Sequence, residues 1–218
     1  MSNIGFGEQE YVQNDDVEKF KLDKKERRIS VVFRDMASAV KGCMTHSVGE
    51  NAAYRPFRCL STKDKKEECC TLDYAKNTPV GKFVVAIIEY NMVENEETGK
   101  MKVVGYKMLP WVFGPKVYTK LSSFHKKYNL AEVDLTVSLD GEAKFQQPNI
   151  MMEKENYWRG NEKLCAKVLA EYDKVIAGYE KKHLPPKKSL AEIRELLGVT
   201  TNEADYADNS TETAEFEV

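Results

Sequence analysis

The chain has 218 residues, 42% hydrophobic and 31% charged, which is typical of a soluble globular protein with one domain and an extension or two small domains. The longest apolar run, Phe83 to Ile88, is far shorter than the roughly 20 residues of a membrane-spanning helix, and the N-terminus has neither the basic start nor the apolar stretch of a signal peptide. These features exclude membrane, collagen-like and secreted disulfide-rich proteins. They predict a cytoplasmic protein whose five cysteines are thiols or metal ligands.

The net charge of −2 hides an uneven distribution. Residues 203–218 hold six acidic residues and residues 1–18 hold five, with no basic residue in either segment, so the stretch between them has 33 basic and 24 acidic residues, a net charge of +9. A basic body attracts polyanions, of which nucleic acid is the commonest. An acidic tail can compete for that surface or dock partner proteins, and uneven solvated charge is the alternative interpretation.

The first third of the chain gives weak signals. Residues 1–17 predict a flexible acidic segment, and the alternation of Phe20 to Leu22 and of Ile29 to Phe33 predicts a hairpin with a charged turn. Residues 36–42 read as a connector or a helical turn. Residues 43–75 have no sustained period and contain four of the five cysteines, so we expect a Cys/His loop that needs something to hold it together.

The middle of the chain is clearer. Phe83 to Tyr90 is a nearly continuous run of β-branched and aromatic residues and predicts a strand buried on both faces. Asn95 to Gly99 follows as a turn, and Lys102 to Met108 reads as the returning strand. Pro115 then opens a predicted helix over 116–128.

Two further strands and two helices are predicted after residue 130. The residues 133–139 alternate, Asp140-Gly141 is a hairpin turn signal, and 143–147 return. Residues 150–179 have helical spacing, with Cys165 in the core. Ser189 and Glu192 form a capping box at the start of a last helix that ends at Gly198.

Five short strands with a helix between the third and fourth favour a mainly β OB-fold, a five-stranded Greek-key barrel, with added C-terminal helices. We expect one domain over 18–199, followed by a disordered acidic tail over 200–218. Other small barrels have a similar pattern.

Aromatic and basic residues interleave in three places, as in proteins where cations follow the phosphates of a single strand and bases stack on rings for about 1–3 kcal/mol each. The three places are Tyr54–Arg58, Tyr106–Lys120 and Tyr157–Arg159. The alternative is that the rings belong to the core, which is the commoner place for any single aromatic residue, including Phe113, Tyr118 and Trp158. For Tyr54, Arg55, Tyr106 and Trp111, polar or proline-rich neighbours bring the two interpretations close to balance.

Four residues have a spacing that resembles a zinc loop: His46, Cys59, Cys69 and Cys70. Adjacent cysteines rarely share one zinc ion, so Cys43 or Asp73 is an alternative fourth ligand. The sequence contains no C-x-x-C pair. On spacing alone, a zinc site and a set of unrelated thiols with a loop histidine are equally good interpretations.

Enzymatic motifs are nearly absent. The sequence has no P-loop, no G-x-G-x-x-G before a helix, no G-x-S-x-G and no H-E-x-x-H, and its three histidines provide little general-base material. The alternative functions are a metal-dependent nuclease or other DNA-processing enzyme, whose carboxylates can be scattered in sequence, and a protein-interaction adaptor that uses its acidic ends.

Over residues 18–200 the chain resembles the T-even-type bacteriophage single-stranded DNA-binding (helix-destabilising) proteins. The resemblance is carried by order and spacing: the opening strands, the His46-x12-Cys59-x9-Cys69 segment, the Phe83 to Tyr90 strand, the Phe113-Gly114-x-Lys116-Val117-Tyr118-x-Lys120-Leu121 segment, and the last helix with its acidic tail. The chain departs from the family pattern at two places. Leu72 stands where the family has its last metal ligand, and the N-terminal segment is acidic rather than basic.

The resemblance implies a non-catalytic OB-fold protein that binds single-stranded DNA without sequence preference in phage DNA replication, recombination and repair, in the host cytoplasm. It also implies a tail, 203–218, that recruits replication and recombination proteins, and zinc as a cofactor if the loop binds it. From the interleaving and the resemblance together, with Phe83, Lys116 and Tyr118 the best matched, the expected DNA-contacting residues are Tyr54, Arg55, Phe57, Arg58, Phe83, Tyr106, Lys107, Trp111, Lys116 and Tyr118.

Overall fold

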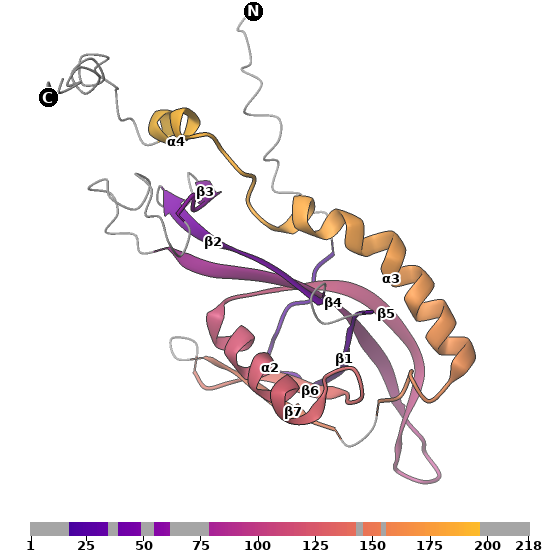
Figure 1. Cartoon of the computed structure of the whole chain (residues 1–218). Helices are drawn as coiled ribbons and strands as arrows, with labels where there is room; N and C mark the ends of the chain where they lie inside the picture. Colours follow the sequence, from indigo (N-terminus) through magenta and orange to yellow (C-terminus); the bar gives the residue numbers. More distant parts are fainter. Residues whose placement is uncertain are drawn as a thin grey trace, which may run out of the picture.

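The computed structural model describes residues 18–34, 39–48, 55–61, 79–142, 146–153 and 156–196, and it shows a mainly β protein (Figure 1). Seven strands form one antiparallel sheet, and helices cover it. In chain order the elements are β1 (Arg27–Val32), β2 (Val40–Val48), β3 (Arg55–Arg58), β4 (Val80–Glu94), β5 (Met101–Phe113), α2 (Pro115–Tyr128), β6 (Leu135–Asp140), β7 (Gln147–Met152), α3 (Glu162–His183) and α4 (Leu190–Leu196).

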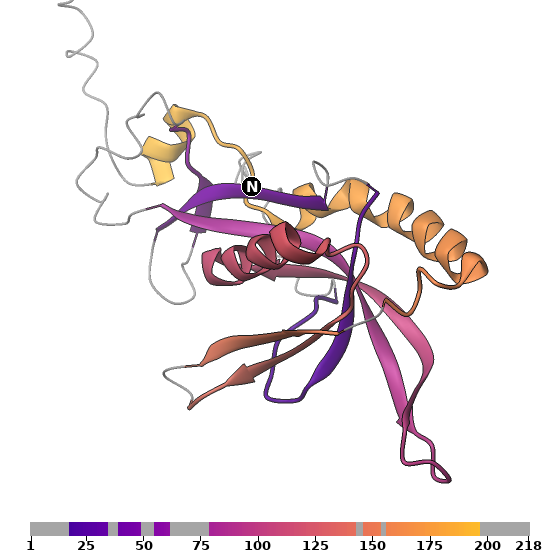
Figure 2. The same ribbon diagram turned by 60° about the horizontal axis from the view of Figure 1, so that its bottom comes forward.

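The strand β4 is the centre of the sheet. The strand order is β3-β2-β4-β1-β6-β7, and β5 pairs with β4 outside this path. One edge of β4 pairs with β5 from Phe83 to Glu94. The other edge pairs first with β2, through Val80 to Val85, and then with β1, through Ala86 to Glu89. The long β4–β5 ribbon therefore crosses the molecule with the shorter strands arranged along it (Figures 1 and 2).

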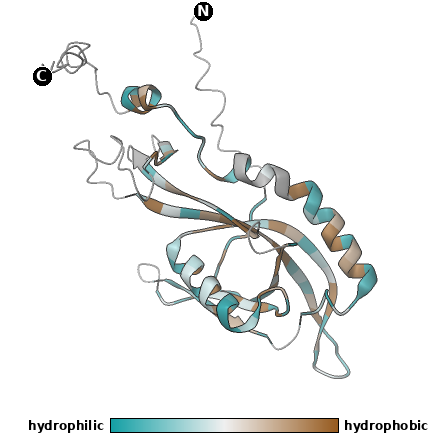
Figure 3. Ribbon diagram, viewed as in Figure 1, coloured by the Kyte–Doolittle hydropathy of each residue, from teal (hydrophilic) through white to brown (hydrophobic). Residues whose placement is uncertain are grey.

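Both faces of β4 are buried, as its continuous apolar run predicted. The side chains of Val85 and Ile87 pack with Val117 and Leu121 of α2 in one core. The alternate residues Val84, Ala86 and Ile88 pack with Val168 and Tyr172 of α3 in a second core. The helix α3 alternates hydrophilic and hydrophobic residues, which suits a helix with one face on a sheet (Figure 3). None of the described helices has the length and apolar character that crossing a membrane requires.

Two local predictions are confirmed in atomic detail. In the β4–β5 turn, the side-chain oxygen of Asn95 accepts hydrogen bonds from the amides of Glu97 and Thr98 at 3.0 and 3.1 Å, and Gly99 adopts a φ of 62°. At the start of α4, the amide of Ser189 donates to the Glu192 carboxylate at 2.7 Å, and the amide of Glu192 donates to Ser189 Oγ at 3.3 Å. This reciprocal pair is the predicted capping box.

The predicted N-terminal hairpin is wrong, because β1 pairs with later strands and not with the segment around Phe20. It pairs with β4 on one side and with β6 on the other. Phe20 instead forms an isolated parallel bridge with Trp111 of β5. Its amide donates to the Pro110 carbonyl at 3.0 Å, and its ring packs edge-on against Trp111 with centroids 5.5 Å apart.

The connector over 36–42 and the irregular loop over 43–75 were also partly wrong, since they contain β2 and β3. In β2, Val40, Gly42, Met44 and His46 share one face of the strand. A glycine and a histidine interrupt the apolar alternation there, so the sequence carried little strand signal. The parts of 43–75 outside β2, β3 and Cys59 to Ser61 lie beyond the described residues.

The helix predicted over 150–179 begins later than expected. Residues 147–152 form β7, which pairs with β6 through Asp140 and Gln147 at one end and Leu135 and Met152 at the other. Pro148 is tolerated because β7 lies at the edge of the sheet. The helix α3 then runs from Glu162 to His183. The acidic segments 1–17 and 200–218 lie outside the described residues.

A buried carboxylate joins three parts of the fold. Asp134 is fully buried and accepts hydrogen bonds from Arg28 Nε at 2.9 Å, from the Tyr90 hydroxyl at 3.0 Å and from the Tyr157 amide at 3.2 Å. Arg28 and Tyr90 belong to β1 and β4, and Tyr157 precedes α3. Next to this group, Trp158 Nε1 donates to Ser30 Oγ at 2.8 Å. Burial raises the pKa of Asp134, and its hydrogen-bond donors oppose that rise.

We expect Asp134→Asn to lower the free energy of unfolding by about 2 to 3 kcal/mol, because the substitution removes the charged partner that Arg28 has in this buried ion pair. Arg28 keeps 26% of its side chain exposed, which places the loss at the lower end of the range for buried pairs. Urea denaturation measures it. The matched control is Asp140→Asn at the exposed end of β6, expected to change stability by less than about 0.5 kcal/mol. Equal effects of the two substitutions would contradict this role of Asp134.

Candidate nucleic-acid interface

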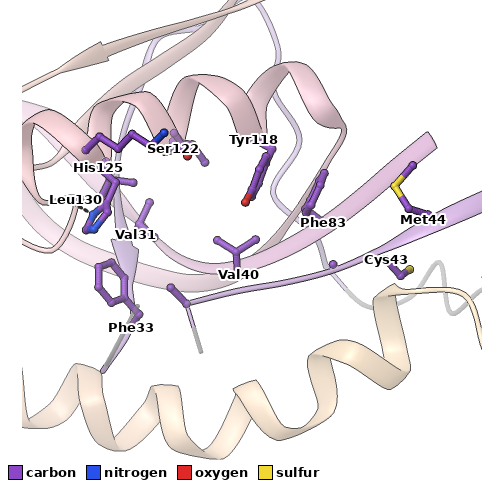
Figure 4. Close-up of a pocket in the computed structure, with 14 residues that line it drawn as sticks. Val31, Phe33, Val40, Cys43, Met44, Phe83, Tyr118, Ser122, His125 and Leu130 are labelled. Atoms are coloured by element: carbon purple, nitrogen blue, oxygen red, sulfur yellow. Dashed lines mark hydrogen bonds between the residues drawn. The ribbon is translucent and has the colours of Figure 1, made fainter. Parts of the chain in front are cut away.

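Two aromatic rings that the sequence placed in the DNA-contacting set lie face to face. Phe83 of β4 and Tyr118 of α2 have ring centroids 4.2 Å apart and planes inclined by 10° (Figure 4). Phe83 is half-buried, and Tyr118 has 41% of its surface exposed. The outer part of this stack therefore offers an aromatic surface to solvent.

Two glycines make room for Phe83. Gly42 is its register partner on β2, and Gly81 precedes it by two positions on the same face of β4. A Cβ atom at Gly42 would lie 2.4 Å from Phe83 Cδ1, and one at Gly81 would lie 2.8 Å from Phe83 Cε2. Both distances are too short for real contacts. The ring can take this position only because these two residues have no side chain.

The stack stands at one end of a cavity of about 570 Å³ between the sheet and α2 (Figure 4). At the other end, Phe33 lies edge-on to His125 with ring centroids 6.4 Å apart. Polar groups come from one side only, through Ser122, His125 and Lys126 of α2. The remaining lining is apolar or glycine: Val31, Phe33, Ala39, Val40, Gly42, Cys43, Met44, Phe83, Leu121 and Leu130, with Tyr118 at the rim. We call this cavity and the stack the groove.

The helix beside the groove has cationic charges and no anionic ones. Lys116, Lys120, Lys126 and Lys127 are all exposed, and α2 contains no acidic residue. Lys126 lines the groove, whereas Lys120 Nζ donates to the Pro148 carbonyl at 2.6 Å on the β7 side of the helix. Lys116 lies two positions before Tyr118, so the helix turns it to a different side at the exposed N-terminal end. Lys126 therefore brings positive charge to the groove, and the other lysines make the exposed surface of α2 basic.

Trp111 and Phe57 correct the expectation that these rings are exposed stacking surfaces. Trp111 is 2% exposed and contacts Phe20 and Phe113 in the core, and Phe57 is fully buried against Ile193 of α4. Alternation in β5 directs Trp111 toward the α2 side of the sheet, where the core closes over it.

Tyr106 and Lys107 lie away from the groove. Tyr106 faces α3, where its hydroxyl donates to Glu171 at 3.2 Å and Lys167 Nζ lies 5.6 Å from the ring centroid. Lys107 forms an ion pair with Glu18. The structure thus separates these two residues, which the sequence had grouped with Tyr118.

The remaining candidates come from β3 and its surroundings. Arg58 Nε donates to the Pro185 carbonyl at 2.5 Å, so its guanidinium ties β3 to the segment before α4. Tyr54 and the side chain of Arg55 lie outside the described residues.

Two of the four proposed metal ligands are described, and they share a face of the β2–β3 ladder. His46 is buried and stacks on Phe57 with centroids 5.3 Å apart. The Cys59 amide donates to the Met44 carbonyl at 2.9 Å, which places Cys59 two positions along the same face. Cys43 lies three positions from His46 and so on the opposite face of β2, which rules out the Cys43-x-x-His46 pair.

Cys69, Cys70 and Asp73 lie outside the described residues, and the described ranges contain no cluster of three or more His, Cys, Asp or Glu. The donors that are described, one imidazole and one thiol on one face, are of the types that zinc prefers. Zinc at this ladder stays a prediction.

Sequence reasoning missed the glycines beneath Phe83 and the far wall of the groove formed by Phe33 and His125. A glycine inside a strand is the signal that could have found Gly42 and Gly81, because it marks a close approach. The position of His125 had no such signal. No protein-family model matches this chain, and no curated protein matches it.

We expect Gly42→Ala to lower the free energy of unfolding by about 1 to 3 kcal/mol, because the new methyl group overlaps the Phe83 ring. The comparison is Gly160→Ala, where a Cβ meets nothing within 4 Å. Chemical denaturation of the two variants measures the difference.

Adding Phe83→Ala to Gly42→Ala tests the cause. If the overlap is responsible, Gly42→Ala should cost little in the Phe83→Ala background. The same loss in both backgrounds would show that Gly42 matters for another reason.

Proposed function

We propose that this chain is a non-catalytic protein that binds single-stranded DNA without sequence preference, through the groove of an OB-fold-type barrel. The observation that carries the proposal is the parallel Phe83–Tyr118 stack at the mouth of an apolar cavity, beside a helix whose charged residues are all basic. If β2 and β3 are counted as an insertion, α2 lies between the third and fourth of the five remaining strands, which is the place of the helix in an OB-fold.

The groove suits unpaired bases better than duplex DNA. A base can stack on the exposed part of Tyr118 or enter the apolar cavity, and every base has a π face, so neither contact depends on sequence. Lys126 and the other α2 lysines can follow the phosphates. Duplex DNA hides the faces of its bases, so affinity for the unpaired strand should exceed affinity for duplex and favour melting.

The biological setting of the proposal rests on the resemblance to the phage helix-destabilising proteins. There such a chain would protect displaced strands during phage DNA replication, recombination and repair in the host cytoplasm. The acidic segment 203–218 would recruit replication and recombination proteins.

We expect Tyr118→Ala to weaken binding of a single-stranded oligonucleotide by about 5- to 150-fold, which corresponds to the loss of one stacked base. The control is Tyr128→Ala, because Tyr128 is exposed on the same helix and does not line the cavity. Fluorescence anisotropy with a labelled 16-mer, single-stranded and duplex, at two salt concentrations measures both variants.

Three results of that titration would contradict the proposal: equal effects of the two tyrosine substitutions, affinity that barely responds to salt, or preference for duplex. Gel analysis of the DNA afterwards tests the nuclease alternative. Intact DNA with and without added divalent metal is the expected result, whereas metal-stimulated degradation would favour the enzyme.

Removal of residues 200–218 should tighten single-strand binding at low salt, because six acidic residues that compete with phosphate are lost. The difference should shrink at high salt, where charge interactions are screened. Titration of the full chain and the truncated chain side by side measures it, and an unchanged affinity at low salt would argue against competition by the tail.

A further inference from the structure

One polar ring lies at the apolar end of the groove. His125 of α2 is half-buried, lines the cavity and meets Phe33 edge-on (Figure 4). The walls around these two rings are apolar and come from Val31, Val40 and Leu130. A cavity of about 570 Å³ with mostly apolar walls and few polar groups has the size and character of a small-molecule pocket. The orientation of the His125 ring therefore decides which chemistry this pocket accepts.

A hydrogen bond fixes the tautomer of the ring. The Leu130 amide donates to His125 Nδ1 at 3.2 Å. A neutral imidazole has one donor and one acceptor nitrogen, so Nδ1, which accepts here, carries no hydrogen, and Nε2 carries it. His125 makes no other hydrogen bond with the residues that the structure describes. Its Nε2–H is thus a donor without a partner in this part of the chain, on a ring that lines the cavity.

The turn after α2 holds the ring in this orientation. Asn129, at the end of the helix, has a φ of 25°, in the left-handed region that asparagine tolerates. Its side-chain oxygen accepts from the Ala131 amide at 3.2 Å, and its side-chain nitrogen donates to Glu132 Oε1 at 2.7 Å. The turn directs the Leu130 amide back toward His125. The ring is therefore set in place before a ligand binds, which keeps the entropy cost of ordering it low.

The donor selects among the molecules that could fill an apolar cavity. An aliphatic chain would leave Nε2–H unpaired in a desolvated place, which costs free energy. A phosphate would lose its hydration against apolar walls. A nucleobase has apolar faces for these walls and acceptor atoms on its edges, and all four bases have such atoms. Ser122 also lines the cavity, and its hydroxyl can donate to or accept from the same edge.

We propose that the cavity encloses one unstacked base of the bound strand, and that His125 Nε2–H donates a hydrogen bond to an acceptor on the edge of this base. The inference rests on the proposed function and divides the groove into two base sites. Tyr118 and His125 are seven residues apart on α2, a rise of about 10.5 Å, which leaves room for one base at each end. The Phe83–Tyr118 stack requires only a π face, whereas the enclosed site also requires an acceptor.

The test changes the acceptor on the ligand and the donor on the protein. One ligand is a labelled single strand of about 8 thymidines, within the range of site sizes for single-strand-binding modules. The other has every thymine replaced by difluorotoluene, which has the shape of thymine but is a poor acceptor. Complete replacement prevents the strand from shifting an ordinary base into the cavity. The full chain is compared with His125→Phe, which keeps an aromatic ring without a donor, and with His125→Gln, which keeps one acceptor and one donor group.

We expect His125→Phe to weaken binding of the thymidine strand by about 2- to 12-fold, which corresponds to one net hydrogen bond. Binding of the difluorotoluene strand should stay within about 2-fold, the error of additivity for independent changes. His125→Gln should recover part of the preference for thymine, because its amide can accept from Leu130 and donate to the base. The control is Lys127→Gln, which alters an exposed residue of α2 outside the cavity and should affect both strands alike.

An equal loss of affinity for the two strands in His125→Phe would overturn the proposal, because His125 would then act through packing alone. A failure of the proposed function has a different signature: the thymidine strand would not bind, or Tyr118→Ala would leave its affinity unchanged. Circular dichroism reports whether His125→Phe is folded. If it is not, the measurement on the unsubstituted chain decides.

That measurement is the NMR signal of the His125 ring. The chain has three histidines, so their ring signals can be assigned by single substitutions. The free protein should carry the ring hydrogen on Nε2, as the bond from Leu130 requires. The thymidine strand should move this hydrogen downfield, because it enters a hydrogen bond, and the difluorotoluene strand should not. A hydrogen on Nδ1, or the same shift with both strands, would contradict the site.

Discussion

The burial of β4 on both faces is the constraint on which the rest of the structure depends. The side chains from Val84 to Ile88 are fully buried, and each of the valines and isoleucines among them contributes about 1.5 to 3 kcal/mol when removed from water. A strand of this kind needs neighbours on both edges and cover on both faces. The strands β5, β2 and β1 satisfy its backbone, and α2 and α3 cover its two faces.

At the start of β4, the alternation of side chains also gives the two faces of the sheet a different chemistry. Phe83 continues the α2-side core outward into a row of ring contacts that runs through Phe20, Trp111, Phe113, Phe83 and Tyr118. Lys82, one position earlier, is turned toward the α3 side of the sheet. A one-residue change of register in β4 would exchange these two sides, so the pairing with β2 is as important for the proposed function as for stability.

The groove combines rigidity with openness. Phe83 is held by the positions of Gly42 and Gly81 and by the rings on either side of it, so it has little freedom to lose when a ligand stacks nearby. Glycines in strands reduce stability, because they bring no side chain and lose more backbone entropy on folding. The buried Asp134 network and the double cover of β4 lie in other parts of the sheet, where they can offset such losses without occupying the groove.

The sequence by itself determined the elements whose signals are local. The apolar run of β4, the Asn95–Gly99 turn, the proline-started α2 and the Ser189–Glu192 capping box depend on residues close together in the chain. Tertiary structure alone decided whether a ring became core or surface, as Trp111 and Tyr118 show, and whether an irregular stretch became strand, as β2 does. It also decided that Phe83 of β4 stacks on Tyr118 of α2, because this contact joins residues far apart in the chain and is set by pairing and packing.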